Sequence, residues 1–596
     1  MEKWMVAARK ADFAKWARDF GISPVVARIL RNRGLTEETQ VEKFLRGTLA
    51  DCHSPWLLKD MDRAVERVWR AVEREEKIRV IGDYDVDGIC SAHILTKGLR
   101  LAGGLADTAI PHRIHDGYGL NDRLIEAAGE DGIRLIVTCD NGIAAAEQIA
   151  LANTLGIDVV VTDHHEVPYV TDRAGGRREI LPEAVAVVDP KRSDCPYPFK
   201  GICGGVVAYK FMQAFLEDGE RVTAYAPDAT AVRESMEEFL EFAAFATVCD
   251  VMELADENRI LVKEGLKRLQ NSRNRGLRAL IRVNGLEAGK LSAYHLGFVL
   301  GPCLNATGRL DTAKRALELL QSDSDTEAMS AARELVEMND SRKNLTSQGV
   351  EAAEQYIVRH HMENDKVLVI YLPEVHESLA GIIAGRVRER HDRPVFVLTK
   401  GEEGVKGSGR SIEAWHMYDG MTQVKELFTK YGGHKMAAGL SMAEENVERL
   451  RRELNERCEL TEEDFAPVVH IDVPMPLSYA SEDLARELEI LEPFGVGNPQ
   501  PLFAQKNLVF LSAAKMGAGG NSAGFRVRTP EGTVERLVLF RNLEGFEEFL
   551  ADKYGPESVG RLYAGQGSYE ISVVYKLGLN TYRGRTEKQF VMQYFC

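Results

Sequence analysis

The sequence lacks the features of a membrane or secreted protein. No apolar run approaches the ~18 residues of a membrane-spanning helix. The opening stretch MEKWMVAARKADFAKWARDF mixes charges throughout instead of offering the apolar core of a signal peptide. The nine cysteines form no C-x-x-C pair, so neither a zinc ribbon nor a disulfide framework is indicated. These absences predict a cytoplasmic protein without a membrane partner.

Net positive charge is lacking as well, since the formal net charge is −16 at pH 7. This value argues against a protein that only coats nucleic acid. It leaves room for an enzyme that combines acidic metal sites with a local basic groove. A P-loop is also missing, because GEEGVKGS fails the G-x-x-x-x-G-K-[ST] spacing, so no nucleotide-hydrolysing motor is supported.

Strand and helix patterns divide the 596 residues into several units. From IRVIGDYD onward, apolar runs that stop at Asp alternate with helical segments, which predicts a doubly wound parallel sheet. A second α/β unit follows, and strands separated by turns at the end predict an OB-like β-barrel. The predicted domains are a helical region at 1–75, a parallel-sheet α/β domain at 76–310, connecting helices at 311–362, a second α/β domain at 363–458 and the barrel at 466–596.

The stretch IRVIGDYDVDGICSAHI contains Asp83, Asp85 and Asp87, followed directly by Gly88. One alternative is a calcium loop of the EF-hand type, which requires Glu at its twelfth position. That position is Ile94, and the stretch follows a strand-like run instead of a helix. The better interpretation is a strand that ends in a turn of carboxylates, where α/β proteins build their sites.

Two further strand-like runs end in metal-binding residue types. Asp140 follows IRLIVTC, and Asp163, His164 and His165 follow IDVVVT. Because parallel strands present their carboxyl ends at one edge, we expect these side chains to converge with the first three aspartates. Mixed carboxylates and imidazoles suit manganese or a similar divalent ion, and two ions about 3.5–4 Å apart can share a bridging Asp.

Several motifs carry a family resemblance. GDYDVDG, CDNG and TDHHE resemble the successive motifs of the DHH phosphoesterase superfamily. PHRIHDGYGL, GICGGVVAYK, GPCLNATGRL, GSGRSIEAWHMYD, YGGHKMAAGL and EPFGVGNPQPLF are similar to motifs of its RecJ branch of single-strand-specific exonucleases. The resemblance implies a DHH domain, a DHHA1 domain in the second α/β unit and an OB domain in the tail.

The resemblance also implies an activity: two-metal hydrolysis of single-stranded DNA from the 5′ end, in DNA repair and recombination. It implies two Mn²⁺ or Mg²⁺ ions as cofactors, a helicase that supplies single strands and a single-strand-binding protein as partners. The implied metal ligands or their close supports are Asp83, Asp85, Asp87, Asp140, Asp163, His164 and Asp250, and the implied catalytic residues are Asp140, His164 and His165.

Positive and polar residues in the later motifs would bind the substrate. Arginine suits this task because its planar fork can meet two phosphate oxygens at once. The implied substrate-binding residues are Arg113, Asn305, Arg309, Ser408, Arg410 and His434. Two alternatives stay open: a DHH-type phosphodiesterase acting on oligonucleotides or cyclic dinucleotides, and a DNA-binding scaffold without catalysis. The terminal barrel favours a long polymer, and the intact acidic and histidine motifs favour catalysis.

Overall fold

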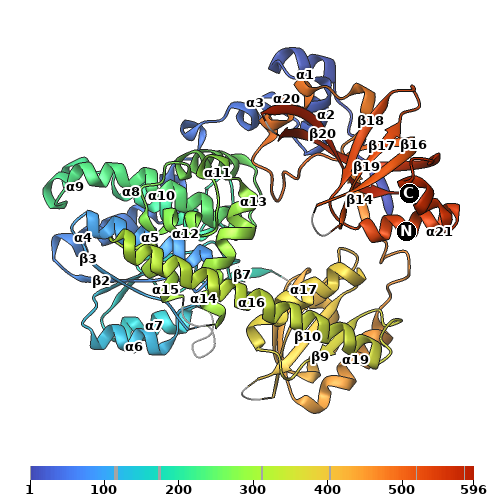
Figure 1. The fold of residues 1–596 in the computed structure, drawn as a ribbon. Coiled ribbons are helices and arrows are strands. Elements are labelled where there is room, and N and C mark those ends of the chain that lie inside the picture. Colours follow the sequence, from blue (N-terminus) through green and yellow to red (C-terminus); the bar gives the residue numbers. More distant parts are fainter. Residues whose placement is uncertain are drawn as a thin grey trace.

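The computed structural model describes residues 2–596 except 113–118, 172–175, 311–312, 402–403, 518–519 and 583, and it leaves out the side chains of residues 309 and 310. Figure 1 shows two α/β domains and a β-barrel, with the long helix α16 (Asp325–Arg359) running from the first domain onto the second. No helix in the described part of the chain has both the length and the apolar character needed to cross a bilayer.

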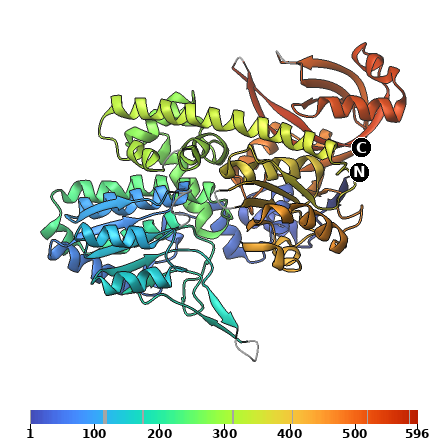
Figure 2. The same ribbon diagram turned by 90° about the horizontal axis from the view of Figure 1, so that it is seen from below.

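The first domain is built on a five-stranded sheet in which every pairing is parallel. Its strand order is β3 (Leu105–Ala109), β2 (Lys77–Ile81), β4 (Leu135–Cys139), β5 (Asp158–Thr162) and β8 (Ala186–Val188). One face packs against α4 (Met61–Glu73), α5 (Val86–Leu101) and α8 (Gly204–Phe215), and the other against α6 (Asp122–Glu130) and α7 (Ala146–Thr154). The predicted doubly wound sheet is confirmed, and Figure 2 shows the helices on both faces.

Helices complete the first domain. They are α9 (Gly219–Tyr225), α10 (Ala229–Cys249), α11 (Asp256–Leu269), α12 (Arg275–Val283), α13 (Ala293–His295), the π-helical turn η4 (Leu296–Leu300), α14 (Gly301–Leu310) and α15 (Lys314–Leu320). Helix α10 packs on α5 and α8, and α14 packs on α16. Through these contacts the helical layer joins the sheet to α16.

The second domain has a mixed sheet, with β9 and β10 parallel and the remaining pairs antiparallel. Its order is β12 (Phe428–Gly433), β13 (Ala437–Met442), β11 (Val405–Arg410), β10 (Val395–Lys400) and β9 (Leu368–Tyr371). Helix α17 (Ala380–His391) and the end of α16 cover one face, and α18 (Met417–Thr422) and α19 (Val447–Arg457) cover the other. The predicted second α/β domain is therefore present.

Five strands close into a barrel, because β16 pairs with both β17 and β19. The circuit is β16 (Phe503–Met516), β17 (Ser522–Arg528), β18 (Val534–Leu539), β20 (Arg585–Phe595) and β19 (Tyr569–Tyr582). Helices α1 (Phe13–Phe20), α2 (Pro24–Asn32) and α3 (Glu38–Arg46) contribute buried side chains to the barrel core, together with α20 (Glu482–Glu487), α21 (Leu543–Tyr554) and α22 (Glu557–Tyr563). Strand β1 (Lys3–Val6) pairs with β14 (Val468–Ile471). The first and last parts of the chain thus share one core.

A buried arginine joins this core to the first domain. Arg259 of α11 is 1% exposed, and its guanidinium lies 3.8 Å from the centre of the Phe44 ring. It donates hydrogen bonds to the carbonyls of Phe44, Ile490, Leu491 and Glu492 at 2.7–2.9 Å. Because an arginine carries five donors, one side chain can fix α3, α11 and the segment before the barrel together.

Candidate active site

The carboxyl ends of three neighbouring strands carry the acidic motifs. Asp83 follows β2, Asp140 follows β4 directly and Asp163 follows β5 directly. Since β4 pairs in parallel with both β2 and β5, the three aspartates lie along one edge of the sheet. The structure therefore brings together the side chains that the sequence expected to converge.

The alternating aspartates of the first motif are positioned by the start of α5. The Asp85 carboxylate caps this helix and accepts a hydrogen bond from the Gly88 N–H at 3.0 Å. A Cβ at Gly88 would lie 2.4–2.5 Å from the Asp83 backbone, so only glycine allows α5 to begin this close to β2. The Asp83 carboxylate accepts a hydrogen bond from Gly119 at 3.3 Å.

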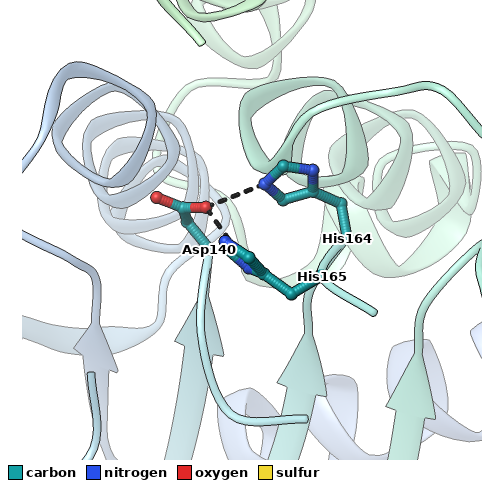
Figure 3. A group of neighbouring side chains, drawn as sticks. All are labelled: Asp140, His164 and His165. Carbon is teal, nitrogen blue, oxygen red and sulfur yellow. Dashed lines mark hydrogen bonds and ion pairs between the residues drawn. The ribbon is translucent and has the colours of Figure 1, made fainter. Parts of the chain in front are cut away.

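Asp140 and the histidine pair form the centre of the site (Figure 3). The Asp140 Oδ1 lies 3.0 Å from His164 Nε2 and 4.0 Å from His165 Nδ1. Asp140 adopts a left-handed backbone with φ +60°, a conformation that Asp tolerates better than most residues. Such backbone geometry concentrates at functional sites.

Asp87 is held by the first turn of α8. Its two oxygens accept hydrogen bonds from the backbone N–H groups of Gly204 and Gly205 at 2.7 and 2.6 Å. The positive end of the helix dipole favours a carboxylate at this place. His164 Nε2 lies 3.4 Å from Asp87 and 3.7 Å from Asp250, which follows the last residue of α10.

The Asp163 carboxylate is engaged within the protein. It accepts hydrogen bonds from the backbone N–H groups of Ile143 at 2.9 Å and His164 at 2.7 Å, and it pairs with His165 Nδ1 at 2.8 Å. Burial alone raises the pKa of Asp163, but the hydrogen bond and charge of His165 outweigh it, so the net shift is downward. Burial lowers the pKa of His165, while the bond to Asp163 raises it to about 9. Asp163 and His165 are therefore held together as a close pair.

The residues fit a pair of divalent cations. Three groups offer ligand atoms within 4.8 Å of one another: Asp140, His164 and His165; Asp87, His164 and Asp250; and Asp83, Asp85 and Asp140. Asp140 belongs to two of these groups, and the two oxygens of its carboxylate can bridge two ions, whereas the His164 Nε2 can bind only one. The mixture of carboxylate oxygen and imidazole nitrogen matches manganese and similar metals.

The pKa shifts of these residues also indicate a cation site. Burial, followed by the charges of Asp87 and Asp85, raises the pKa of Asp140 well above its usual value. Burial and then Asp87 raise the pKa of Asp250 to about 8. Burial lowers the pKa of His164, which favours the neutral imidazole that binds metals. A cation among these groups would offset the repulsion between the carboxylates.

The predicted substrate-binding residues lie on several elements. Arg113 falls outside the described residues, and Arg309 lies in the last turn of α14 with its side chain outside the description. Asn305 is half-buried on the same helix. A Cβ at Gly308 would lie 2.7 Å from the carbonyl of Tyr84, so α14 reaches the metal-binding edge. The exposed His434 follows β12, and its Nδ1 accepts a hydrogen bond from the Met436 N–H.

Ser408 and Arg410 lie on β11 of the second domain. The Arg410 guanidinium rests against the first turn of α17, where a Cβ at Gly381 would lie 2.8 Å from its Nη2. Within the described part of the chain, Arg410 forms no ion pair and donates one hydrogen bond, to the Gly409 carbonyl at 2.7 Å. Burial, then the charge of Arg388, lowers the pKa of Arg410. An anion could pair with this guanidinium.

Sequence reasoning did not include Gly204, Gly205 and Asp189 among the site residues. The signal for the glycines is the G-G pair at the start of a helical pattern in GICGGVVAYK. Asp189 follows β8, the next strand end, and its Oδ2 is buried with no hydrogen-bond partner among the described residues. Burial, then Asp163, raises the pKa of Asp189 to about 7. Its signal is AVAVVDP, another apolar run that stops at Asp.

Three family descriptions match successive parts of the chain. The N-terminal domain of the DHH family matches residues 77–247, the DHHA1 domain matches residues 364–460, and the RecJ OB domain matches residues 471–594. These matches fall on the first α/β domain, the second α/β domain and the barrel.

Relatives match across nearly the whole chain. The single-stranded-DNA-specific exonuclease RecJ of Escherichia coli is 33% identical, over 96% of this chain and 95% of the relative. The crystal structure of RecJ from Thermus thermophilus in complex with Mn²⁺ is similar with a TM-score of 0.78 and 26% identity, over 100% of this chain and 79% of that one. The Mg²⁺ complex from the same organism has a TM-score of 0.72 and 25% identity, over 100% and 78%.

Proposed function

The chain belongs to the RecJ family of single-stranded-DNA-specific exonucleases, and from this premise we propose that it removes nucleotides from the 5′ end of single-stranded DNA. It is a metal-dependent phosphodiester hydrolase whose cofactor is Mn²⁺ or Mg²⁺. The observation that carries the proposal is the cluster at the sheet edge, where the Asp140 carboxylate belongs to two ligand groups.

Each residue of the cluster has a proposed task. The ligands for two ions are Asp83, Asp85, Asp87, Asp140, His164 and Asp250. Two ions held by these residues would supply a water molecule of lowered pKa and positive charge beside the phosphodiester. Gly204 and Gly205 hold the Asp87 carboxylate in place through their N–H groups.

Asp163, which the sequence placed among the possible ligands, is better suited to positioning. Its carboxylate holds the His164 backbone and the His165 ring in place. His165, whose side chain is 44% exposed, lies at the open side of the cluster. At this place its imidazole can donate a hydrogen bond to a bound phosphate, which supports the predicted catalytic part of His165.

The proposed 5′ polarity rests on Arg410. A guanidinium without an ion pair in the described chain, next to Ser408 and the start of α17, suits a terminal phosphate. Helix α14 lies against η5 (Glu377–Leu379) of the second domain, so the substrate-binding elements of the two domains meet. A phosphate pocket at a fixed distance from the metal ligands would define the end from which cleavage starts.

The proposal extends to partners and location. A nuclease that requires single strands depends on a helicase to supply them, and a single-strand-binding protein would share the same substrate. We place the protein in the cytoplasm, where DNA is processed in bacteria. The closed barrel and the complete ligand set favour this function over a small-molecule phosphodiesterase or a scaffold without catalysis.

Replacing Asp140 tests the site assignment. Asp140→Asn should lower the rate of DNA hydrolysis by more than about 100-fold, since even partners of metal ligands typically cost 10–100-fold. The affinity for DNA should change little, because the contacts with the DNA backbone remain. The control is Asp131→Asn, a carboxylate with a 58% exposed side chain in the same domain. Near-normal hydrolysis by Asp140→Asn, measured with Mn²⁺, would show that the cluster is not the active site.

A further inference from the structure

Helix α13 lies on the side of the first domain nearest the barrel (Figure 1), and α13 and the adjoining η4 carry two exposed aromatic rings. Phe298 of η4 is 72% exposed and Tyr294 of α13 is 57% exposed. The two rings stack on each other, with centroids 5.2 Å apart and planes inclined by 23°. Large exposed rings of this kind usually mark a surface that binds something.

The rings belong to the helical segment 293–310, which also carries predicted substrate-binding residues. Asn305 lies on α14 of this segment, seven residues after Phe298. At the far end of this segment, Gly308 packs on Tyr84, between two of the aspartates. The segment therefore connects the aromatic pair to the metal-binding edge.

The near end of the segment is also fixed to the site. The Cys249 thiol, next to Asp250, donates to the Leu296 carbonyl at 3.6 Å. A Cβ at Gly301 would lie 2.5 Å from the Cys249 sulfur, so the segment packs closely on the end of α10. The π-helical turn between these contacts carries Phe298, and such turns are frequent at functional sites.

We propose that Tyr294 and Phe298 form a stacking platform for nucleobases of the single strand that leads into the active site. Stacking on aromatic side chains suits an exonuclease because every base has a π-face, so binding does not depend on sequence. The strand's phosphates would follow Asn305 and Arg309 while its bases contact the rings. The inference rests on the proposed function and adds a contact that holds the strand between cleavage steps.

Variants of Phe298 separate stacking from general apolar contact. Phe298→Ala and Phe298→Leu should each raise the KM for single-stranded DNA about 5- to 150-fold, the range expected for loss of one stacked base. The kcat at saturating substrate should stay within about 2-fold of the wild type, because the metal ligands are untouched. Phe298→Trp should keep a KM near the wild-type value. Tyr225→Ala, another exposed ring in the first domain, is the matched control.

Strands with a single abasic site at successive positions from the 5′ end give the decisive measurement. For the wild type, one position or two adjacent positions should show the same KM increase as Phe298→Ala, and Phe298→Ala should show no further increase there. Equal abasic profiles for the two proteins overturn the inference. A change in oligomeric state of Phe298→Ala by light scattering also overturns it, because the rings would then form a contact between two copies. Failure of the wild type to hydrolyse any strand would instead overturn the proposed function.

Discussion

At the scale of single residues, the site depends on glycines as much as on its carboxylates. Gly204 is the first residue of α8, and a Cβ there would lie 2.8 Å from the Asp140 Cβ and 3.0 Å from Asp87 Oδ2. Any larger residue must displace one of these two aspartates. The glycine is therefore a support for the predicted metal ligands.

Gly204→Ala should lower the rate of hydrolysis about 10- to 100-fold, the usual cost of disturbing a partner of metal ligands. Gly219→Ala is a close control, because Gly219 is also the first residue of a helix and a Cβ there meets nothing within 4 Å. Hydrolysis rates at several Mn²⁺ concentrations would measure both variants. Equal rates for Gly204→Ala and the wild type would contradict the proposed geometry.

The same residues show how far the sequence predicts the site. Asp83, Asp140 and His164 could be found because each stands at the end of an apolar run, and strand ends meet at one edge. The G-G pair indicates a special position at Gly204, but the contact of Gly204 with Asp87 and Asp140 joins residues far apart in the chain and cannot be predicted from that pattern. The positioning role of Asp163 likewise follows from hydrogen bonds that only the folded structure reveals.

At the scale of elements, helix α10 carries a buried carboxylate away from the site. Glu241 is 4% exposed and accepts a hydrogen bond from the Ser272 hydroxyl at 2.5 Å. Burial raises its pKa from 4.5 to about 7. Because the folded state binds this proton more tightly than the unfolded state, stability falls as the pH rises from about 4.5 through 7.

Glu241→Gln should remove this pH dependence. Above pH 7 the variant should be more stable than the wild type, by up to about 3 kcal/mol from the size of the pKa shift. The difference should vanish well below pH 4.5, where the wild-type carboxyl is protonated in both states. Thermal unfolding across this pH range, with Glu237→Gln as an exposed control on the same helix, would measure it. A stability difference that does not change with pH would contradict the raised pKa of Glu241.

The sequence predicts strands and helices well where their apolar pattern is strong. It predicts them less well where pairing between distant segments determines the structure. The parallel strands β2, β4 and β5 could be located because each is a short apolar run with a defined end. Closure of the barrel depends on pairing between β16 and β19, which are separated by two strands and two helices in the sequence. Sequence patterns therefore predicted a barrel without determining whether it was open or closed.

At the scale of the whole molecule, the first and last parts of the chain form one core, which packs against the first α/β domain. Helices α1, α2 and α3 complete the barrel core, and Arg259 joins that core to α11. Composition and periodicity indicated a helical first segment but could not show that it packs against residues more than four hundred positions away. This packing fixes the barrel beside the helical layer that carries Asn305 and Phe298.

The central claim, hydrolysis of single-stranded DNA from the 5′ end, is tested most directly with end-labelled strands in the presence of Mn²⁺. A label at the 5′ end should be released in the first step as a mononucleotide, and a label at the 3′ end should be released last. Replacing the 5′ phosphate by a hydroxyl should slow cleavage, because the Arg410 pocket loses its anion. Release of the 3′ label first, or no hydrolysis of either strand, would contradict the account.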